Sequence, residues 1–192
     1  MVSRYVFTLV IAALAVERLI ELRISRRNSA WAKGAGAIEY GAGHLPWMKL
    51  LHTCFFVGCL LEVWLLRRPF VPALAAVAAM LAVLAQALRY WTIGTLGQRW
   101  NVAVLVLPGV PAAVSGPFRY LRHPNYVAVA VEIMVVPLVH GAYLTAGIFS
   151  ALNAVLLGVR IRCEERALAE HCGYHQRLGS RPRFWPARPL GP

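Results

Sequence analysis

The feature that most constrains this chain is a series of long apolar runs, because a helix that crosses a bilayer needs about 20 mostly apolar residues. Five runs approach or reach that length, and 59% of the 192 residues are hydrophobic against 15% charged. Soluble domains of this size carry fewer apolar and more charged residues. The sequence therefore predicts an all-α, polytopic integral membrane protein, with spans at residues 5–24, 47–66, 70–88, 126–139 and 143–159.

The basic residues lie mainly on one side of these spans. Sixteen Lys and Arg residues fall in segments 23–49, 89–122 and 160–192, and three fall at positions 4, 67 and 68. Because positively charged loops remain in the cytoplasm, this asymmetry predicts an outside N-terminus and a cytoplasmic C-terminal tail, in a bacterial plasma membrane. The short link at residues 140–143 predicts a tight hairpin of the last two spans.

The net charge of +12 has two possible origins. The basic residues sit between apolar runs, so membrane topology and anionic lipid explain them better than nucleic-acid binding does. No internal repeat or linker divides the chain, which predicts one domain over residues 1–192. The four cysteines lack disulfide or zinc spacing, so we expect free thiols and no metal site. The N-terminal run lacks a signal-peptide cleavage site, so we interpret it as a span.

Several polar residues fall inside the predicted spans, where a charge costs several kcal/mol. Glu132 lies ~12 Å into the fourth span, and Asn153 lies ~10 Å deeper than Arg160 in the fifth. Asn125 and Glu132 share one helix face, as do Asn153, Arg160 and Glu164. This pattern predicts a polar slot that opens to the cytoplasm. A direct hydrogen bond between Glu132 and Asn153 that holds the hairpin together explains the same pattern equally well.

Three charged residues near the end of the first span form a second group. The i, i+4 spacing of Glu17 and Glu21, with Arg18 between them, favours internal pairing. His52 and Glu62 in the second span are weaker signals, because a lone histidine in a span is more often a packing or hydrogen-bonding residue than a ligand.

The stretch "GPFRYLRHPNY", residues 116–126, precedes the fourth span. Pro124 suits the first turn of a helix because proline has no N–H to donate. Arg122 and His123 then lie beside the positive end of that helix, where a carboxylate or another anionic group binds well. The alternative is an interfacial anchor, since Arg, His and Tyr are common at the membrane boundary.

Three segments in order, "GPFRYLRHPNYVAVAVE", "RIRCEERAL" and "GYHQRLGSRPRFWP", resemble the signature of the isoprenylcysteine carboxyl methyltransferase family. The upstream segments resemble its bacterial branch of alkylpyrone and alkylresorcinol O-methyltransferases. One departure is Arg177, where the family tail often has a second tyrosine. The matching residues are Arg122, His123, Pro124 and Tyr126, then Arg160, Ile161, Glu164, Glu165 and Leu168, then Tyr174, Pro182, Arg183 and Phe184.

The resemblance implies a methyltransferase that uses S-adenosyl-L-methionine, with a cofactor-binding core at about residues 116–186. Arg160 and Glu164 are expected near the point of methyl transfer, and Asn125 and Asn153 are expected to bind the substrate. Arg160 suits a carboxylate acceptor, whereas a hydroxyl acceptor would gain from a base such as Glu132 or Glu164. The residues expected to bind the cofactor are Arg122, His123, Pro124, Tyr126, Glu165, Leu168 and Tyr174.

The expected acceptor is lipophilic. The buried Glu132 favours the hydroxyl of a long-chain alkylpyrone or alkylresorcinol, and a prenylcysteine carboxylate is the alternative. Two other enzyme classes carry similar motifs: NADPH-dependent membrane sterol reductases share His-Pro-Asn-Tyr, and phospholipid N-methyltransferases share Arg-His-Pro-x-Tyr. A membrane scaffold with a basic, lipid-binding tail is the non-enzymatic alternative.

Overall fold

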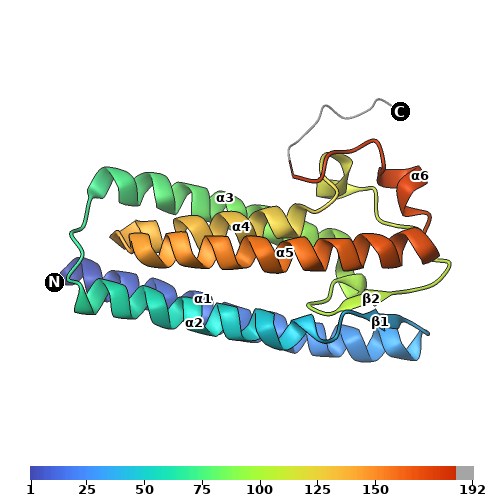
Figure 1. The fold of residues 1–192 in the computed structure, drawn as a ribbon, viewed down its shortest axis with the longest axis horizontal. Coiled ribbons are helices and arrows are strands. Elements are labelled where there is room, and N and C mark those ends of the chain that lie inside the picture. Colours follow the sequence, from blue (N-terminus) through green and yellow to red (C-terminus); the bar gives the residue numbers. More distant parts are fainter. Residues whose placement is uncertain (185–192) are drawn as a thin grey trace.

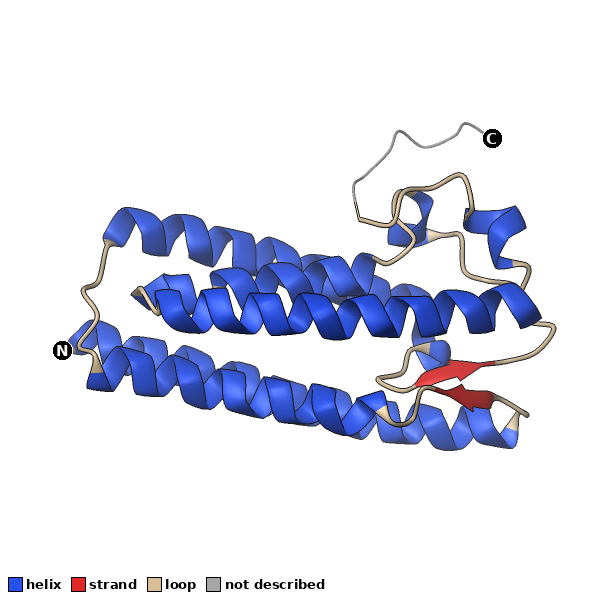
Figure 2. Cartoon of the chain, viewed as in Figure 1, coloured by secondary structure: helices blue, strands red, loops and turns tan. Residues whose placement is uncertain are grey.

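The computed structural model describes residues 1–184, and most of the chain forms helices (Figures 1 and 2). The strands β1 and β2 form a small antiparallel pair in which Ile38 lies opposite Val106. All five predicted spans fall on helices, which confirms the all-α fold class. The elements are α1 (Val2–Gly34), β1 (Ile38–Tyr40), α2 (His44–Leu65), α3 (Pro72–Leu96), η1 (Gly97–Arg99), β2 (Val104–Val106), η2 (Gly116–Arg119), α4 (Pro124–Val135), η3 (Pro137–His140), α5 (Tyr143–His171) and α6 (Tyr174–Leu178).

Prolines set both limits of α4. Pro124 occupies the first turn of α4, as its missing N–H predicts. The fourth predicted span was expected to run unbroken to residue 139, but α4 ends at Val135. Pro137 cannot donate a backbone hydrogen bond, so the chain continues as the short 3-10 turn η3. Gly141, with φ of 66°, then reverses the chain into α5 and closes the predicted hairpin.

The helices form two layers, with α1 and α2 in one and α3, α4 and α5 in the other (Figure 1). Apolar side chains fill the space between the layers at the end that holds the N-terminus. This core includes Phe7 and Ile11 from α1, Phe55 and Val63 from α2, and Ile133 from α4. The cavities described below lie beside this core and toward the opposite end of the bundle.

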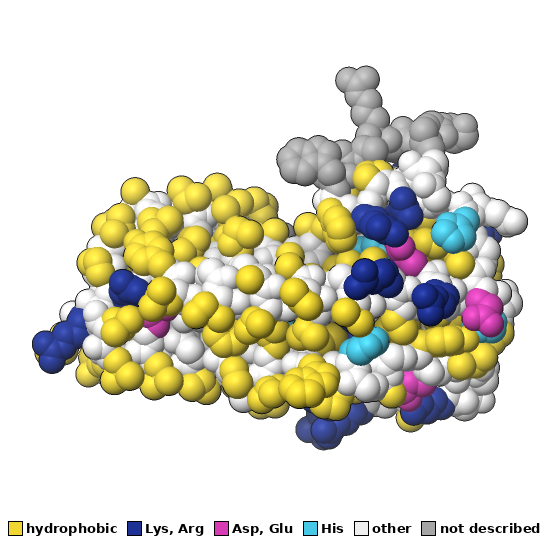
Figure 3. Space-filling model, viewed as in Figure 1, with side chains coloured by type: hydrophobic (Ala, Val, Ile, Leu, Met, Phe, Trp, Pro, Cys, Tyr) yellow, Lys and Arg dark blue, Asp and Glu magenta, His cyan; other side chains and the backbone are white. Residues whose placement is uncertain are grey.

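The outside of the bundle is apolar over most of its length, as Figure 3 shows for one face. Leu9, Val83 and Val155 are 70%, 67% and 67% exposed, which is the reverse of a soluble protein and typical of lipid-facing helices. Among the described residues, three helices are long and apolar enough to cross a membrane, at His44–Leu65, Pro72–Arg99 and Tyr143–His171. The chain is an integral membrane protein.

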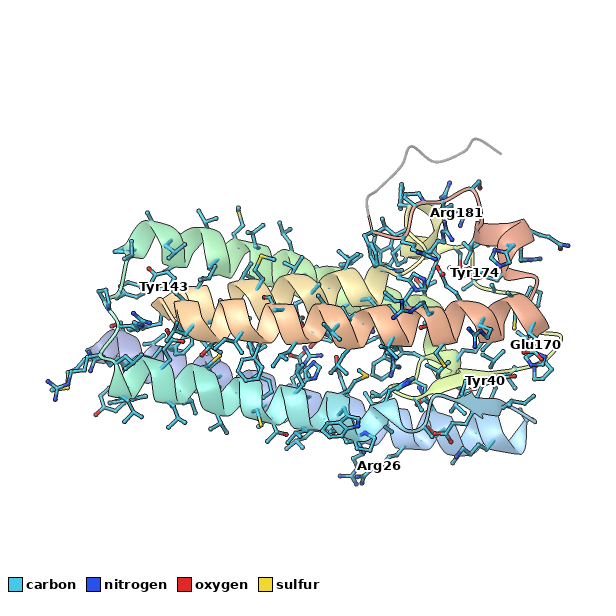
Figure 4. All side chains as sticks on the ribbon, viewed as in Figure 1. Arg26, Tyr40, Tyr143, Glu170, Tyr174 and Arg181 are labelled. Carbon is cyan, nitrogen blue, oxygen red and sulfur yellow. The ribbon has the colours of Figure 1, made fainter. Side chains whose placement is uncertain are left out.

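One end of the bundle is polar. The β1–β2 pair and α6 pack against α5, and η2 packs against α3, all opposite the end that holds the N-terminus (Figure 1). Charged side chains gather at this end on the face shown in Figure 3. Tyr40, Glu170, Tyr174 and Arg181 lie there, whereas Tyr143 lies at the other end of α5 (Figure 4). Tyr174, one of the residues of the predicted site, therefore lies at the polar end of the molecule.

Candidate active site

The stretch before α4 is held in place by the C-terminal tail. The backbone N–H of Arg122 donates to the Pro182 oxygen at 3.0 Å, and its side-chain Nε donates to the Arg181 oxygen at 2.5 Å. The chain can pass close to α3 at residue 116 because that residue is glycine. Its φ of 56° disfavours other residues, and a Cβ atom there would collide with the Thr95 side chain. Segments far apart in the sequence are thus joined at the start of α4.

Glu165 is the centre of this junction. Its Oε1 lies 3.1 Å from His123 Nε2 and accepts from the Tyr174 hydroxyl at 2.9 Å. Arg183 donates through Nε to Oε1 at 2.9 Å and through Nη2 to Oε2 at 2.5 Å. Burial and the bond to Glu165 raise the pKa of Tyr174 above its usual value, so the phenol keeps its proton and remains a donor. Four predicted cofactor-site residues are brought together here, since Arg122 Nη1 also approaches Glu165 at 3.6 Å.

A second cluster joins α4 to α5 one turn away. Arg160, which is 6% exposed, donates through Nε to the Tyr126 hydroxyl at 2.7 Å. That hydroxyl in turn donates to Glu164 Oε2, and Arg160 also donates to the Val102 oxygen and approaches Met48 Sδ at 2.9 Å. The predicted residues Tyr126, Arg160 and Glu164 therefore form one hydrogen-bonded chain.

Two adjacent hollows of about 100 Å³ and about 130 Å³ lie beside these clusters, and we refer to them together as the polar cleft. His123, Pro124, Asn125 and Tyr126 line the first hollow, and Tyr174 lines the second. Glu165 is absent from both linings, so among the described residues it supports the cleft wall from behind. Both hollows are lined by Leu96, Arg99, Leu105, Val106, Phe118, Arg122, Glu164 and Leu168.

A larger cavity of about 480 Å³, here called the apolar cavity, lies between the two layers of helices. Leu19 of α1 and Val57 of α2 line it and are 65% and 50% exposed, so the cavity reaches the lipid-facing surface. Most of its remaining wall is apolar, including Leu22, Phe56, Val129 and Leu157.

Five residues line both the polar cleft and the apolar cavity, and we call them the shared wall: Trp100, Asn101, Asn125, Tyr126 and Arg160. Trp100 Nε1 and Asn125 Oδ1 are buried without a hydrogen-bond partner among the described residues. Buried polar atoms are normally paired, so these two are available to a ligand. A polar ligand in the cleft and a lipophilic one in the cavity would meet at this wall.

Glu132 and Asn153 lie elsewhere. Glu132 receives Arg89 Nε at 3.2 Å and Nη2 at 2.5 Å, and Arg18 Nη2 lies 3.5 Å away. Within residues 1–184, its carboxylate is thus paired with arginines and not with Asn153, which corrects the hydrogen-bond interpretation. Asn153 is buried at 4% exposure, and neither residue is among those that line the polar cleft or the apolar cavity. Of the five residues of the predicted slot, Asn125, Arg160 and Glu164 line the polar cleft. A catalytic role for Glu132 and a substrate-binding role for Asn153 stay predictions.

The charged group on the first span pairs internally, as predicted. Arg18 contacts Glu21 and lies 3.5 Å from Glu17. The structure adds Arg89, whose Nη1 lies 3.6 Å from Glu21. Glu132 completes this group, which links α1, α3 and α4 at the side of the apolar cavity.

Sequence reasoning missed the loop after α3. Trp100 and Asn101 belong to the shared wall, and α1 positions both of them. Asn28 Nδ2 donates to the Trp100 oxygen at 2.7 Å, and Ser25 donates to Asn101 Oδ1 at 2.7 Å. The available signal was the length of the connection between α3 and α4, because long irregular segments inside compact domains are commonly functional.

Known proteins share both the sequence and the fold. Residues 77–170 match the family model described as the isoprenylcysteine carboxyl methyltransferase (ICMT) family. The uncharacterized protein YpbQ of Bacillus subtilis is 43% identical over 166 residues, which cover 86% of this chain and 98% of YpbQ. An uncharacterized protein of Haemophilus influenzae is 27% identical over 159 residues, covering 82% of this chain and 92% of its own.

A solved structure of the eukaryotic intramembrane Ras methyltransferase ICMT has a similar fold, with a TM-score of 0.52 at 21% identity. The match covers 69% of this chain and 50% of the solved chain, so this chain spans about half of that relative. The family match includes the start of α4 and the pair Glu164 and Glu165 of α5, the elements that build the polar cleft. This chain is therefore a member of the isoprenylcysteine carboxyl methyltransferase family, a family of membrane methyltransferases.

Proposed function

We propose that this protein transfers a methyl group from S-adenosyl-L-methionine to an oxygen of a lipophilic acceptor, either a long-chain alkylpyrone or alkylresorcinol hydroxyl or a prenylcysteine-like carboxylate. The observation that carries the proposal is the shared wall between the polar cleft and the apolar cavity. A methyl donor that is soluble in water and an acceptor that is soluble in lipid need two compartments that meet at one point.

The side chains of the polar cleft fit the cofactor chemically. Its amino-acid part carries a carboxylate and an ammonium, which Arg122 or Arg99 and Glu164 complement in charge. Its adenosine part is flat and largely apolar, and Phe118 and Leu168 offer matching surfaces. When bound, the cofactor supplies a methyl group on a positively charged sulfur.

The protein then has to place the acceptor oxygen and exclude water. Arg160 is suited to the first task because its charge is permanent and Tyr126 and Val102 hold its guanidinium in a fixed orientation. The apolar walls of the large cavity serve the second task, since they leave little space that water would favour.

The arrangement also supports the predicted orientation in a bacterial plasma membrane. The polar cleft and most basic loops lie at the same end of the bundle. With that end in the cytoplasm, the cleft opens where S-adenosyl-L-methionine is made, and the N-terminus lies outside.

Arg160→Ala tests the catalytic wall. We expect methyl transfer from labelled cofactor to lipid to fall by about 100-fold or more, because misplacing a reacting group costs about that factor. Arg162→Ala is the matched control, since Arg162 is exposed on the same helix. Equal activity of the two variants would contradict the proposed role of Arg160.

Calorimetric titration separates the other enzyme classes. We expect the purified protein to bind S-adenosylhomocysteine and not NADPH. Binding of NADPH alone would replace the methyltransferase proposal with the reductase alternative, and methylated ethanolamine lipids after expression would indicate a phospholipid N-methyltransferase.

A further inference from the structure

His52 is a polar residue of the apolar cavity for which the site described above gives no role. It lies on α2, and it lines the cavity together with Arg160, Tyr126 and Asn125. Its Nδ1 lies 2.8 Å from the backbone oxygen of Met48. A carbonyl oxygen can only accept, so Nδ1 carries the hydrogen, and the neutral ring keeps a lone pair on Nε2. Within residues 1–184, Nε2 makes no hydrogen bond of its own.

The position of His52 relates it to the shared wall. Met48 contacts Arg160 through its sulfur at 2.9 Å. His52 follows Met48 by one helical turn, or ~6 Å along α2, on the same face of the helix. The imidazole of His52 and the shared wall line the same cavity. A lipophilic acceptor bound in this cavity with its oxygen at the shared wall therefore shares the cavity with the imidazole.

Each of the three carboxylates near this cavity has at least one oxygen held by another side chain. Glu21 is paired through Oε2 with Arg18 and Arg89, whereas its Oε1 is buried without a hydrogen-bond partner among the described residues. Glu132 behind it is paired with the same two arginines. Glu164, on the cleft side of the wall, accepts from the Tyr126 hydroxyl. The charged groups that face His52 are thus Arg18 and Glu21 from α1, Lys49 from its own helix, Arg89 from α3, Glu132 from α4 and Arg160 from α5.

We propose that His52 is the base of this site: Nε2 accepts a hydrogen bond from an acceptor hydroxyl and takes its proton during methyl transfer. This step rests on the function proposed above. A lone pair of the acceptor oxygen forms the O–C bond, the C–S bond breaks with its electrons moving to sulfur, and the hydroxyl proton moves to Nε2. The acceptor is then a lipid with a phenolic or enolic hydroxyl, because a carboxylate has no proton to donate to Nε2.

The substitutions His52→Gln and His52→Ala separate binding from proton transfer. The glutamine amide can occupy the place of Nε2 as a hydrogen-bonding group but cannot take a proton at neutral pH. His44→Gln is the matched control, because His44 lies on the same helix and is not among the residues that line either the polar cleft or the apolar cavity. All variants are assayed in lipid nanodiscs with a long-chain alkylresorcinol and with a farnesylated cysteine.

We expect the wild-type kcat for the alkylresorcinol to rise with pH as the imidazole loses its proton, and then to level off. His52→Gln should lower kcat by about 100-fold or more and remove this rise. Its KM should stay close to the wild-type value. Alkylresorcinol binding without cofactor, followed by tryptophan fluorescence, should weaken in His52→Ala and persist in His52→Gln. The control should resemble the wild type in every assay.

The inference is overturned if His52→Gln keeps the wild-type kcat and pH profile, or if only the farnesylated cysteine is methylated. S-adenosylhomocysteine binding distinguishes this failure from failure of the proposed function. If the wild type and His52→Gln both bind S-adenosylhomocysteine and are equally active, only the role of His52 is wrong. If the wild type does not bind it, the methyltransferase proposal itself fails.

Discussion

Glu165 shows how one side chain holds the site together. Its two carboxylate oxygens receive His123 from the start of α4, Tyr174 from α6 and Arg183 from the tail. These partners are far apart in sequence, so the carboxylate fastens the tail over the polar cleft. Hydrogen bonds to a charged group contribute about 1.5–3 kcal/mol each, which makes Glu165 a sensitive point.

Glu165→Ala is expected to weaken S-adenosylhomocysteine binding by about tenfold or more, because the unpaired partners would release the tail from the cleft wall. Calorimetric titration measures the effect. Glu170→Ala is the matched control, since the Glu170 side chain on the same helix is 61% exposed and its ion-pair partner is His171, at 3.8 Å. Equal affinities of the two variants would show that the tail does not depend on Glu165.

At the scale of the elements, α2 holds the start of α5 through Glu62. Its carboxylate accepts the backbone N–H groups of Leu144 at 3.1 Å and Thr145 at 2.7 Å, and Arg68 pairs with it at 2.8 Å. The first N–H groups of a helix have no partner within the helix, so a carboxylate there compensates them. The sequence suggested only a weak role for Glu62, and the structure shows that it caps α5.

Glu62→Ala is therefore expected to lower the Tm of the detergent-solubilised protein by about 2 °C or more, the shift expected for a loss of 1–3 kcal/mol in a chain of this size. Glu39→Ala serves as its control, because Glu39 is paired with Lys33 at the surface and such pairs contribute little. Thermal unfolding followed by tryptophan fluorescence would reveal either result. An unchanged Tm for Glu62→Ala would contradict the capping role.

The molecule as a whole is divided along its length. On the face shown in Figure 3, exposed apolar side chains cover most of the bundle, and charged groups gather at one end. The cavity joins these two regions, because its wall includes both lipid-facing residues and the buried Arg160. A chain built in this way brings a lipid and a soluble molecule together without moving either fully into the other's solvent.

The proposed orientation is tested by labelling cysteines in intact bacteria with a reagent that does not cross membranes. Val2→Cys should react in intact cells, because position 2 is 77% exposed at the end assigned to the outside. Ser180→Cys, at an exposed position beyond α6, should react only after lysis. The unsubstituted protein provides the background from its native thiols, all of which are free. The opposite labelling pattern would reverse the assignment.

Local patterns were sufficient for part of this description. The apolar runs predicted where the long helices lie because backbone hydrogen bonding in a bilayer leaves few alternatives to a helix. Pro124 predicted the start of α4, because proline suits the first turn of a helix. Arg160 and Glu164 could be placed on one face because spacing on a helix reports which residues share a face. The family resemblance assigned His123 and Tyr126 to the same site.

Contacts between distant elements could not be read in the same way. The depth of Glu132 and Asn153 along their helices suggested that the two side chains would face each other. Depth does not give the rotation of one helix relative to another, and Glu132 is paired with Arg89 of α3 instead. Trp100 and Asn101 had no periodic signal, because an irregular loop is positioned by its anchors on α1. The proposed role of His52 depends on its Nε2, which makes no hydrogen bond among the described residues, and on the cavity that His52 shares with Arg160.

The sequence by itself determined that this protein is a helical membrane protein with a methyltransferase motif at one polar end. These properties depend on hydrophobicity and on short-range spacing, which neighbouring residues set. Only the tertiary structure decided where the cleft and the cavity meet and which carboxylates are already paired. Those properties depend on how five helices rotate and pack against one another, because a buried charge takes whichever partner the packing brings within reach.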